Sequence, residues 1–156
     1  MDSCGKYGRY YQWTAAMALD PQFNTTVAGA SLPRRGICPE NWHLPSQPEF
    51  NVLRGAYTPS QLKSSSGWAV DDSDYAADDP SYGYGLNLVG FNILAAGITG
   101  GGLKGRWAVF WTASEAGVDF PDYALYSSFT NGIGDGPQDQ AQEKGTYLYP
   151  IRCVKN

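Results

Sequence analysis

The stretch GICPENWHLPSQPEF, residues 36–50, holds the local signals that decide the fold. Its first half places Cys38 between turn-forming residues. In its second half, Ser46 followed by Glu49 forms a capping-box pattern, with Pro48 tolerated in the first turn, so we predict that a helix begins there. Phe50, Leu53 and Tyr57 recur at helical spacing and are expected to form one buried stripe, and Pro59 marks the stop.

The other end of the chain, YPIRCVKN at residues 149–156, supplies a second cysteine in an apolar setting. Three cysteines allow at most one internal bridge. Cys38 and Cys153 lie in segments that look structured, whereas Cys4 lies in residues 1–7, which we expect to be disordered. We therefore predict a Cys38–Cys153 disulfide and an oxidising compartment. Three reduced thiols in a cytoplasmic protein are the alternative.

Composition limits the class of protein. A length of 156 residues predicts a single domain, here residues 8–156, and 19 Gly, 10 Pro, 11 Tyr and 5 Trp with 17% charged residues favour short strands joined by irregular loops. The net charge of -4, without a basic cluster beyond Arg34-Arg35, argues against binding to nucleic acid or anionic membranes. Because no apolar run approaches about 20 residues, we expect no membrane insertion by this domain.

Local patterns predict helices early and strands late, which is an α+β domain. We expect a strand over 8–14, a helix over 15–19, and strands over 91–96, 107–112, 123–129 and 146–155. The 107–112 segment has apolar side chains on both faces, so it is expected to be a central strand.

Several motifs, in order along the chain, resemble the Fibrobacter-succinogenes-type major paralogous domain. They are YYQWTAAMA at 10–18, GICPENWHLP at 36–45 with 49–53, GF at 90–91 with AG at 96–97, FWTAS at 110–114 and IRCVK at 151–155. Asn41 stands where the family usually has Gly, and Ile151 where it usually has Val. The resemblance implies a C-type-lectin-like fold, in which two short helices pack on a small, mostly antiparallel sheet with long irregular loops. The first and last strands pair in that fold, and Cys38 and Cys153 lie where its bridge would be.

The resemblance also implies an extracellular, cell-surface or virion-surface module, and some such domains are the variable proteins of diversity-generating retroelements. Randomised AAC-type codons in those systems cannot encode Trp, Met, Lys, Glu or Gln. Residues 116–137 contain none of the five types, and we expect a variable region over about 106–152. Aromatic and small polar side chains there resemble antibody paratopes. The candidate ligand-binding residues are Trp107, Val109, Val118, Phe120, Asp122, Tyr123, Tyr126, Ser128 and Asn131.

Strand alternation leaves open which of these side chains face solvent, because Leu125, Ser127 and Phe129 share the face of Tyr123. A second site hypothesis uses acidic residues as calcium ligands, although their spacing fits no EF-hand and a solvated acidic loop competes with it. These are Asp71, Asp72, Asp74, Asp78 and Asp79. His43, the one histidine of the sequence, is expected to be structural.

No catalytic constellation can be assembled from the sequence, so we expect no enzymatic activity and no cofactor. The first functional hypothesis is a ligand-binding display domain for an unidentified protein or glycan. A calcium-assisted glycan lectin or pilus-type adhesin that uses the aspartate loop is the second. A degenerate formylglycine-generating-type enzyme is the third, and it would require a redox-active cysteine pair near a cleft.

Overall fold

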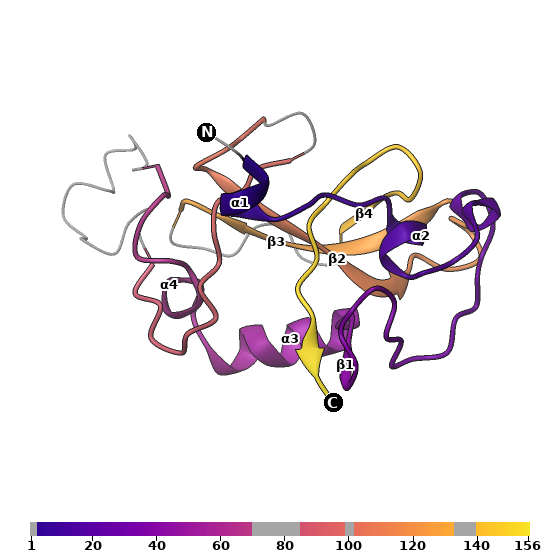
Figure 1. Ribbon diagram of the computed structural model, residues 1–156, viewed down its shortest axis with the longest axis horizontal. Helices are drawn as coiled ribbons and strands as arrows, with labels where there is room; N and C mark the ends of the chain where they lie inside the picture. Colours follow the sequence, from indigo (N-terminus) through magenta and orange to yellow (C-terminus); the bar gives the residue numbers. More distant parts are fainter. Residues whose placement is uncertain (1–2, 70–84, 99–101, 133–139) are drawn as a thin grey trace. The chain divides into compact units, whose positions relative to one another are not determined.

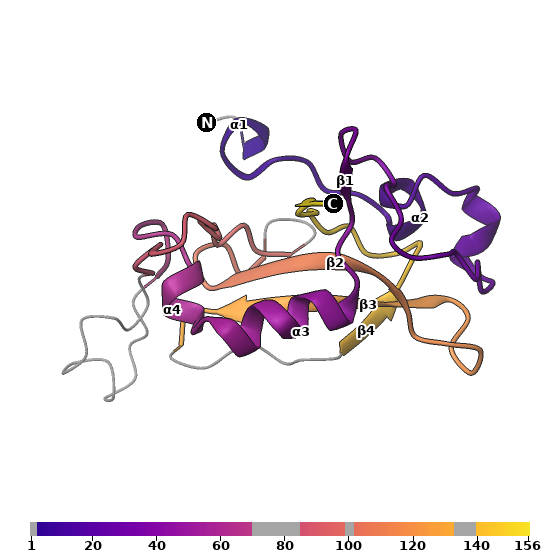
Figure 2. The same cartoon turned by 90° about the horizontal axis from the view of Figure 1, so that it is seen from below.

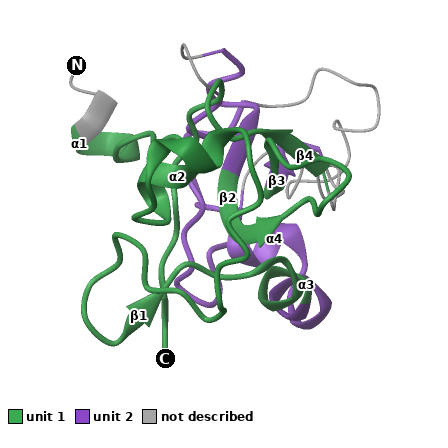
Figure 3. Cartoon of the chain, turned by 90° about the vertical axis from the view of Figure 1, so that its right-hand side faces the viewer, with its two compact units in different colours: residues 1–51, 110–127, 139–156 green, residues 52–109, 128–138 purple. Residues whose placement is uncertain are grey.

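The computed structural model describes residues 3–69, 85–98, 102–132 and 140–156. The chain divides into two compact units, which Figure 3 shows in separate colours. Unit 1 consists of residues 1–51, 110–127 and 139–156, and unit 2 of residues 52–109 and 128–138. In the described part of the chain, no helix is long and apolar enough to cross a membrane.

Two small sheets form among the described residues, and the chain is α+β as predicted. The strands β2 (Trp107–Glu115), β3 (Tyr123–Thr130) and β4 (Gln140–Glu143) form one sheet in the order β2-β3-β4 (Figure 1). The pair β3–β4 is antiparallel, with Tyr123 opposite Glu143. The strands β1 (Trp42–His43) and β5 (Val154–Lys155) form the other sheet, also antiparallel, which confirms that the first and last strands pair.

In the three-stranded sheet β2 lies at the end of the order β2-β3-β4, but Ala108 also pairs with Gly97 through an isolated parallel bridge, so the predicted 107–112 strand has a neighbour on each side. The edge is also covered by irregular backbone. In unit 1 the N–H of Trp111 donates to the carbonyl of Pro150 at 3.2 Å, and the N–H of Ala113 donates to Pro45 at 2.8 Å. These bonds satisfy edge groups that would otherwise need water or a further strand, which explains how a strand with two apolar faces can lie there.

The N-terminal segment is more helical than predicted. The segment Ser3–Tyr7 forms a short helix, α1. The expected strand over 8–14 is reduced to a bridge between Tyr11 and Tyr149, after which α2 (Trp13–Ala16) and a short 3-10 helix, η1 (Pro21–Asn24), follow. Tertiary burial overrides strand propensity here, because the Trp13 side chain is fully buried and its Nε1 donates to the carbonyl of Thr112 at 2.8 Å.

The later strand predictions are also longer than the observed strands. Residues 91–96 pair through the isolated bridge of Ile93 with Lys63. Residues 146–155 contribute the Tyr149 bridge and the two residues of β5. Backbone carbonyls and N–H groups of these segments bond to loops instead, so hydrogen bonding is met without long ladders.

The predicted helix is α3 (Gln47–Ala56), and half of its capping box is present. The Glu49 carboxylate accepts from the N–H of Ser46 at 2.8 Å, which is one of the two bonds of a capping box. In the other bond of that motif the Ser46 hydroxyl would accept from a backbone N–H, but here it donates to the Glu49 carboxylate at 2.7 Å. Phe50 is buried as predicted, whereas Tyr57 lies beyond the end of the helix and is exposed. Pro59 begins a further short helix, α4 (Pro59–Leu62).

The GICPEN segment is fixed by a close approach to α2. Gly36 has a φ of 55°, and a Cβ at this position would lie 2.3 Å from the carbonyl oxygen of Ala16, so a side chain does not fit. Asn41 has a φ of 65°, a conformation that Asn tolerates better than other non-glycine residues. This explains why Asn can replace the usual Gly at this position.

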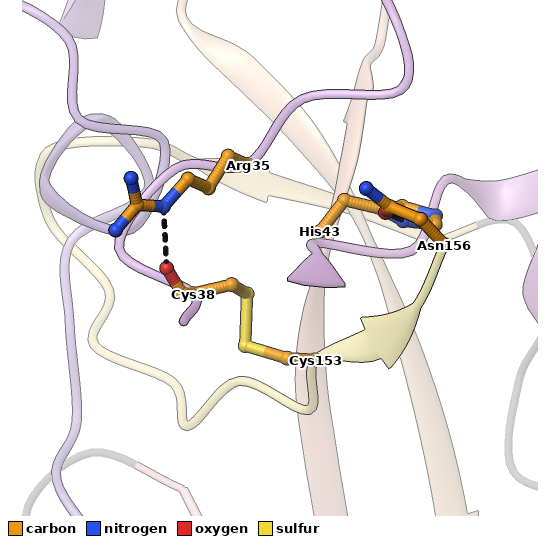
Figure 4. The surroundings of a disulfide bond; sticks show 5 residues. All are labelled: Arg35, Cys38, His43, Cys153 and Asn156. Atoms are coloured by element: carbon orange, nitrogen blue, oxygen red, sulfur yellow. Dashed lines mark hydrogen bonds between the residues drawn. A yellow bond between two sulfur atoms is a disulfide. The ribbon is translucent and has the colours of Figure 1, made fainter. Parts of the chain in front are cut away.

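The predicted disulfide is present. Cys38 and Cys153 are bonded, with Cα atoms 5.9 Å apart and a sequence separation of 115 (Figure 4). The Arg35 Nε donates to the Cys38 carbonyl at 2.8 Å and holds the turn that carries the cysteine. The last residues of the chain are therefore tied covalently to the segment that precedes β1.

Each unit has its own buried apolar residues. The core of unit 1 is built from Trp13, Ala16, Met17, Cys38, Leu44, Phe50, Phe110, Trp111, Ala113, Ala124 and Tyr149. The core of unit 2 is built from Leu62, Trp68, Ile93, Ala95, Ala96, Ala108, Val109 and Phe129.

Candidate binding surface

The loop that joins β2 to β3, residues 116–122, is called the hairpin loop below (Figure 2). Its backbone is closed by short-range hydrogen bonds: Ala116 donates to Tyr123 at 3.1 Å, and Phe120 to Gly117 at 3.2 Å. Gly117 has a φ of 105°, which L side chains rarely adopt. The main chain of the loop is thus ordered by its own backbone groups, without its exposed side chains.

Two predicted binding residues extend from the hairpin loop into solvent. Val118 is 81% exposed and Phe120 is 60% exposed. The Phe120 ring meets the ring of Tyr123 edge-on, with centroids 6.2 Å apart. Asp122 and Tyr123 are half-buried beside them. The structure therefore brings Val118, Phe120, Asp122 and Tyr123 together at one end of the sheet.

Other predicted binding residues do not belong to this surface. Val109 is 1% exposed and Ser128 is 0% exposed, so neither side chain is part of the exposed surface. They lie on strands whose two faces are both covered, a situation that simple alternation does not reveal. Trp107 and Asn131 are half-buried residues of unit 2, where the Asn131 side chain donates to the Ala69 carbonyl at 3.3 Å.

Tyr126 lies on the opposite face of β3 from Tyr123 and joins an aromatic cluster in unit 1. Its ring packs edge-on against Tyr149 at 5.4 Å, and Tyr149 packs on Trp111 at 4.7 Å. Burial chiefly raises the pKa of Tyr149 to about 12, so this phenol stays neutral. Tyr126 is half-buried, and its ring packs within this aromatic cluster and not beside Val118 and Phe120 at the hairpin loop.

A buried lysine holds the base of the hairpin loop. Lys144, which directly follows β4, is 0% exposed, and its ammonium donates to the Glu115 carboxylate and to the Pro121 carbonyl, both at 2.6 Å. It also lies 3.0 Å from the Thr26 carbonyl oxygen and 3.3 Å from that of Phe23. We call this group of contacts the Lys144 anchor. It joins the end of β2, the hairpin loop and residues 23–26.

Glu115 completes the anchor from the end of β2. Its two carboxylate oxygens accept from the N–H groups of Ala28 and Gly29, each at 2.9 Å. Burial alone would raise the pKa of Glu115, but the hydrogen bonds from Lys144, Ala28 and Gly29 outweigh burial and lower it. Glu115 is therefore a carboxylate that balances the buried ammonium charge.

The backbone of the anchor also engages the loop. The Lys144 N–H donates to the Asp122 carbonyl at 2.9 Å, next to the Pro121 carbonyl that its ammonium binds. Two consecutive carbonyls of the hairpin loop are thus held by one residue that lies outside it. Because the acceptors are main-chain atoms, these contacts do not depend on which side chains the loop carries.

A second buried lysine makes comparable contacts within unit 2. Lys63 is 1% exposed, and its ammonium donates to the carbonyls of Thr130 and Gly132, each at 3.2 Å. It also lies 5.0 Å from the centre of the Trp68 ring. Lys63 therefore binds the main chain where β3 ends, again through carbonyl groups.

Neither Glu115 nor either lysine was predicted as part of the site. A usable signal was present, because Glu115 directly precedes the 116–137 segment that lacks five residue types, and Lys144 follows it closely. Periodicity cannot show that a lysine is buried, however, since its partners are carbonyls from distant segments.

His43 is structural, as predicted, and links β1 to α3 and to the end of the chain. Its Nδ1 lies 2.6 Å from Asn156 Oδ1, and its Nε2 lies 2.8 Å from Glu49 Oε1 (Figure 4 shows His43 beside Asn156). With an acceptor at each ring nitrogen, the protonated imidazolium fits best. Burial alone would lower the pKa of His43, but the hydrogen bonds to Glu49 and Asn156 raise it above 6.5.

We expect the stability of the protein to fall as pH rises above neutrality. The stabilisation from His43 is complete below its ordinary pKa of 6.5 and is lost as pH rises through the raised folded value. Burial would raise the pKa of Glu49, but its hydrogen bonds lower it below 4.5, so its contribution is lost only at more acidic pH. Thermal unfolding from pH 5.5 to 8.5 should show a falling midpoint that flattens in His43→Gln. Equal pH slopes in both proteins would contradict this.

The calcium hypothesis falls on residues that lie outside the described part of the chain. Asp71, Asp72, Asp74, Asp78 and Asp79 are all within residues 70–84. Among the residues that are described, no group of three or more His, Cys, Asp and Glu side chains could hold a metal ion. The aspartate-loop prediction is therefore untested.

The fold and the surface define a disulfide-closed α+β domain with a hairpin loop held through its main chain. The chain belongs to the Fibrobacter succinogenes major domain family, whose family model matches residues 2–155. Comparison with curated proteins and with solved structures gave no match.

Proposed function

We propose that this domain is a non-enzymatic ligand-binding module that displays a changeable surface on a constant frame of C-type-lectin-like type. The observation that carries the proposal is the hairpin loop itself. Its carbonyls at Pro121 and Asp122 are held by Lys144, whereas Val118 and Phe120 point into solvent. A loop ordered through its main chain can change its side chains without refolding, which keeps the entropic cost of binding low.

The composition of residues 116–137 supports diversification of this surface by a retroelement. The segment lacks Trp, Met, Lys, Glu and Gln, and these are the five residue types that a randomised AAC-type codon cannot encode. Buried members such as Ala124, Ser127 and Phe129 would be fixed, because a change of volume there is costly. Exposed members such as Val118 and Phe120 would vary.

The Cys38–Cys153 disulfide supports a structural role for the two cysteines and an extracellular or surface location, because disulfides persist in oxidising compartments. The enzyme hypothesis needs a redox-active cysteine pair near a cleft. A bridge that ties the last strand to the segment before β1 favours the binding module instead.

A library randomised at Val118, Phe120 and Asp122 tests the proposal. Most variants at the two exposed positions should keep their free energy of unfolding within about 0.5 kcal/mol, and selection against a test protein such as lysozyme should yield binders. The matched interior control, Ala124→Phe, should lose about 1–3 kcal/mol by overpacking. If substitutions at 118 and 120 cost as much as the one at Ala124, the loop is not a display surface.

The surrounding DNA provides an independent test of the retroelement origin. We expect a near-copy of the codons for residues 106–152, differing chiefly at adenines, beside a reverse transcriptase gene. A gene neighbourhood with neither feature would contradict diversification by this route and leave the library experiment as the test of binding.

A further inference from the structure

The exposed apolar side chains of the hairpin loop lie within an acidic surrounding. Asp119 lies between Val118 and Phe120 in the loop and is exposed, and Asp122 follows it three residues later. Glu143 on β4 stands directly opposite Tyr123, whose hydroxyl lies 3.5 Å from Glu143 Oε1. We call this surface, made of Val118, Asp119, Phe120, Asp122, Tyr123 and Glu143, the hairpin patch.

The carboxylates of the hairpin patch have no cationic partner among the described residues. In the part of the chain that the structure describes, Asp119, Asp122 and Glu143 make no ion pair. Lys144 is next to Glu143 in sequence, but its ammonium points inward and is paired with Glu115. The negative charge of Glu143 is the main cause that raises the pKa of the Tyr123 hydroxyl. Desolvation and the charge of Asp122 raise it further.

This combination selects one kind of partner. A cationic side chain gains from nearby carboxylates and from the face of an aromatic ring, and the aliphatic stem of Lys or Arg packs on apolar surface. Nucleic acids and other polyanions are repelled by the same charges, and a neutral glycan gains little from them. Exposed Val118 and Phe120 add apolar contact of the sort found at the centre of protein interfaces.

We propose that the hairpin patch docks a protein segment bearing Arg or Lys, with the cationic side chain stacked on Phe120 or Tyr123 and its charge directed at Asp119, Asp122 and Glu143. This inference rests on the proposed function, since it assigns the partner class of the same loop. The residues of the loop set the charge preference in this chain, while the Lys144 anchor holds their positions.

Titration of the intact ¹⁵N-labelled protein with tetra-arginine peptide at low salt tests the inference. We expect saturable shifts of backbone amide signals in residues 117–123 and 140–143, which weaken severalfold as salt screens the charges. A tetra-citrulline peptide of the same length, which has no charge, should give no comparable shifts. Absence of the arginine-dependent shifts, or equal shifts with citrulline, would overturn the proposal.

Variants separate the patch from general attraction to an acidic protein. Glu143→Gln should weaken tetra-arginine binding, and the triple change Asp119→Asn, Asp122→Asn, Glu143→Gln should weaken it about fivefold or more. Glu40→Gln, a matched change at an exposed residue outside the patch, should have no effect. Phe120→Ser should also weaken binding through loss of the ring. Equal effects of Glu143→Gln and Glu40→Gln would refute the assignment.

The outcome is separable from that of the proposed function. Binders selected from the loop library against lysozyme, together with no response to tetra-arginine, would leave the display function standing and remove the cationic preference. Tetra-arginine binding at the hairpin patch, together with loop variants that fail to fold, would leave the cationic preference standing and remove the display function.

Discussion

Replacing Lys144 with methionine is expected to lower the free energy of unfolding by about 3–5 kcal/mol. The ammonium is fully buried and pairs with Glu115 at 2.6 Å, so its removal leaves a carboxylate in the interior without its counter-charge. The carbonyls of Pro121 and Thr26 also lose a donor. Urea unfolding at pH 7 measures the loss directly.

Two further proteins make the Lys144 experiment specific. Lys155→Met changes an exposed lysine on β5 and should alter stability by no more than about 0.5 kcal/mol. The double variant Glu115→Gln, Lys144→Met removes both charges and should be more stable than Lys144→Met alone, because no unpaired charge stays buried. A loss below about 1 kcal/mol for Lys144→Met would show that the anchor does not hold the loop.

Removing the disulfide is expected to cost a comparable amount, about 4 kcal/mol in the chain-entropy model. The reason is the 115-residue separation between Cys38 and Cys153, since the bridge restricts a long loop of the unfolded chain. The double change Cys38→Ser, Cys153→Ser should therefore lower the urea midpoint strongly, and reduction of the parent protein should reproduce the effect.

Cys4→Ser is the matched control for this experiment, because Cys4 is not part of the bridge. It should leave the midpoint unchanged, and the stability of the Cys38→Ser, Cys153→Ser protein should no longer respond to reductant. If the parent protein has the same midpoint with and without reductant, the disulfide does not stabilise the fold.

Local signals predicted those elements that local interactions stabilise. The start of α3 followed from Ser46 and Glu49, and the strands β2 and β3 followed from their runs of β-branched and aromatic residues. Strand length was overestimated near Tyr11 and Ile93, because pairing there is limited to single bridges. Propensity measures a preference of one segment, whereas a ladder needs a partner of equal length.

The candidate surface was predicted in part. Val118 and Phe120 are exposed as a binding loop requires, but Val109 and Ser128 are buried. Period-two alternation assigns faces to a strand, yet it does not say whether a neighbouring segment covers the second face. The Glu143 carboxylate joined the surface only through its register opposite Tyr123, which depends on pairing between strands.

The sequence by itself determined the α+β class, the family, the cysteine pair and the position of the hairpin loop, because each is written in short motifs or in residue spacing. Tertiary structure alone decided that Lys144 is an internal cation and that Glu115 is its partner. The four oxygen acceptors of the Lys144 ammonium come from Phe23, Thr26, Glu115 and Pro121. Three of these are backbone carbonyls, which every residue possesses, so no residue type in the sequence marks them as a binding site for an ammonium group.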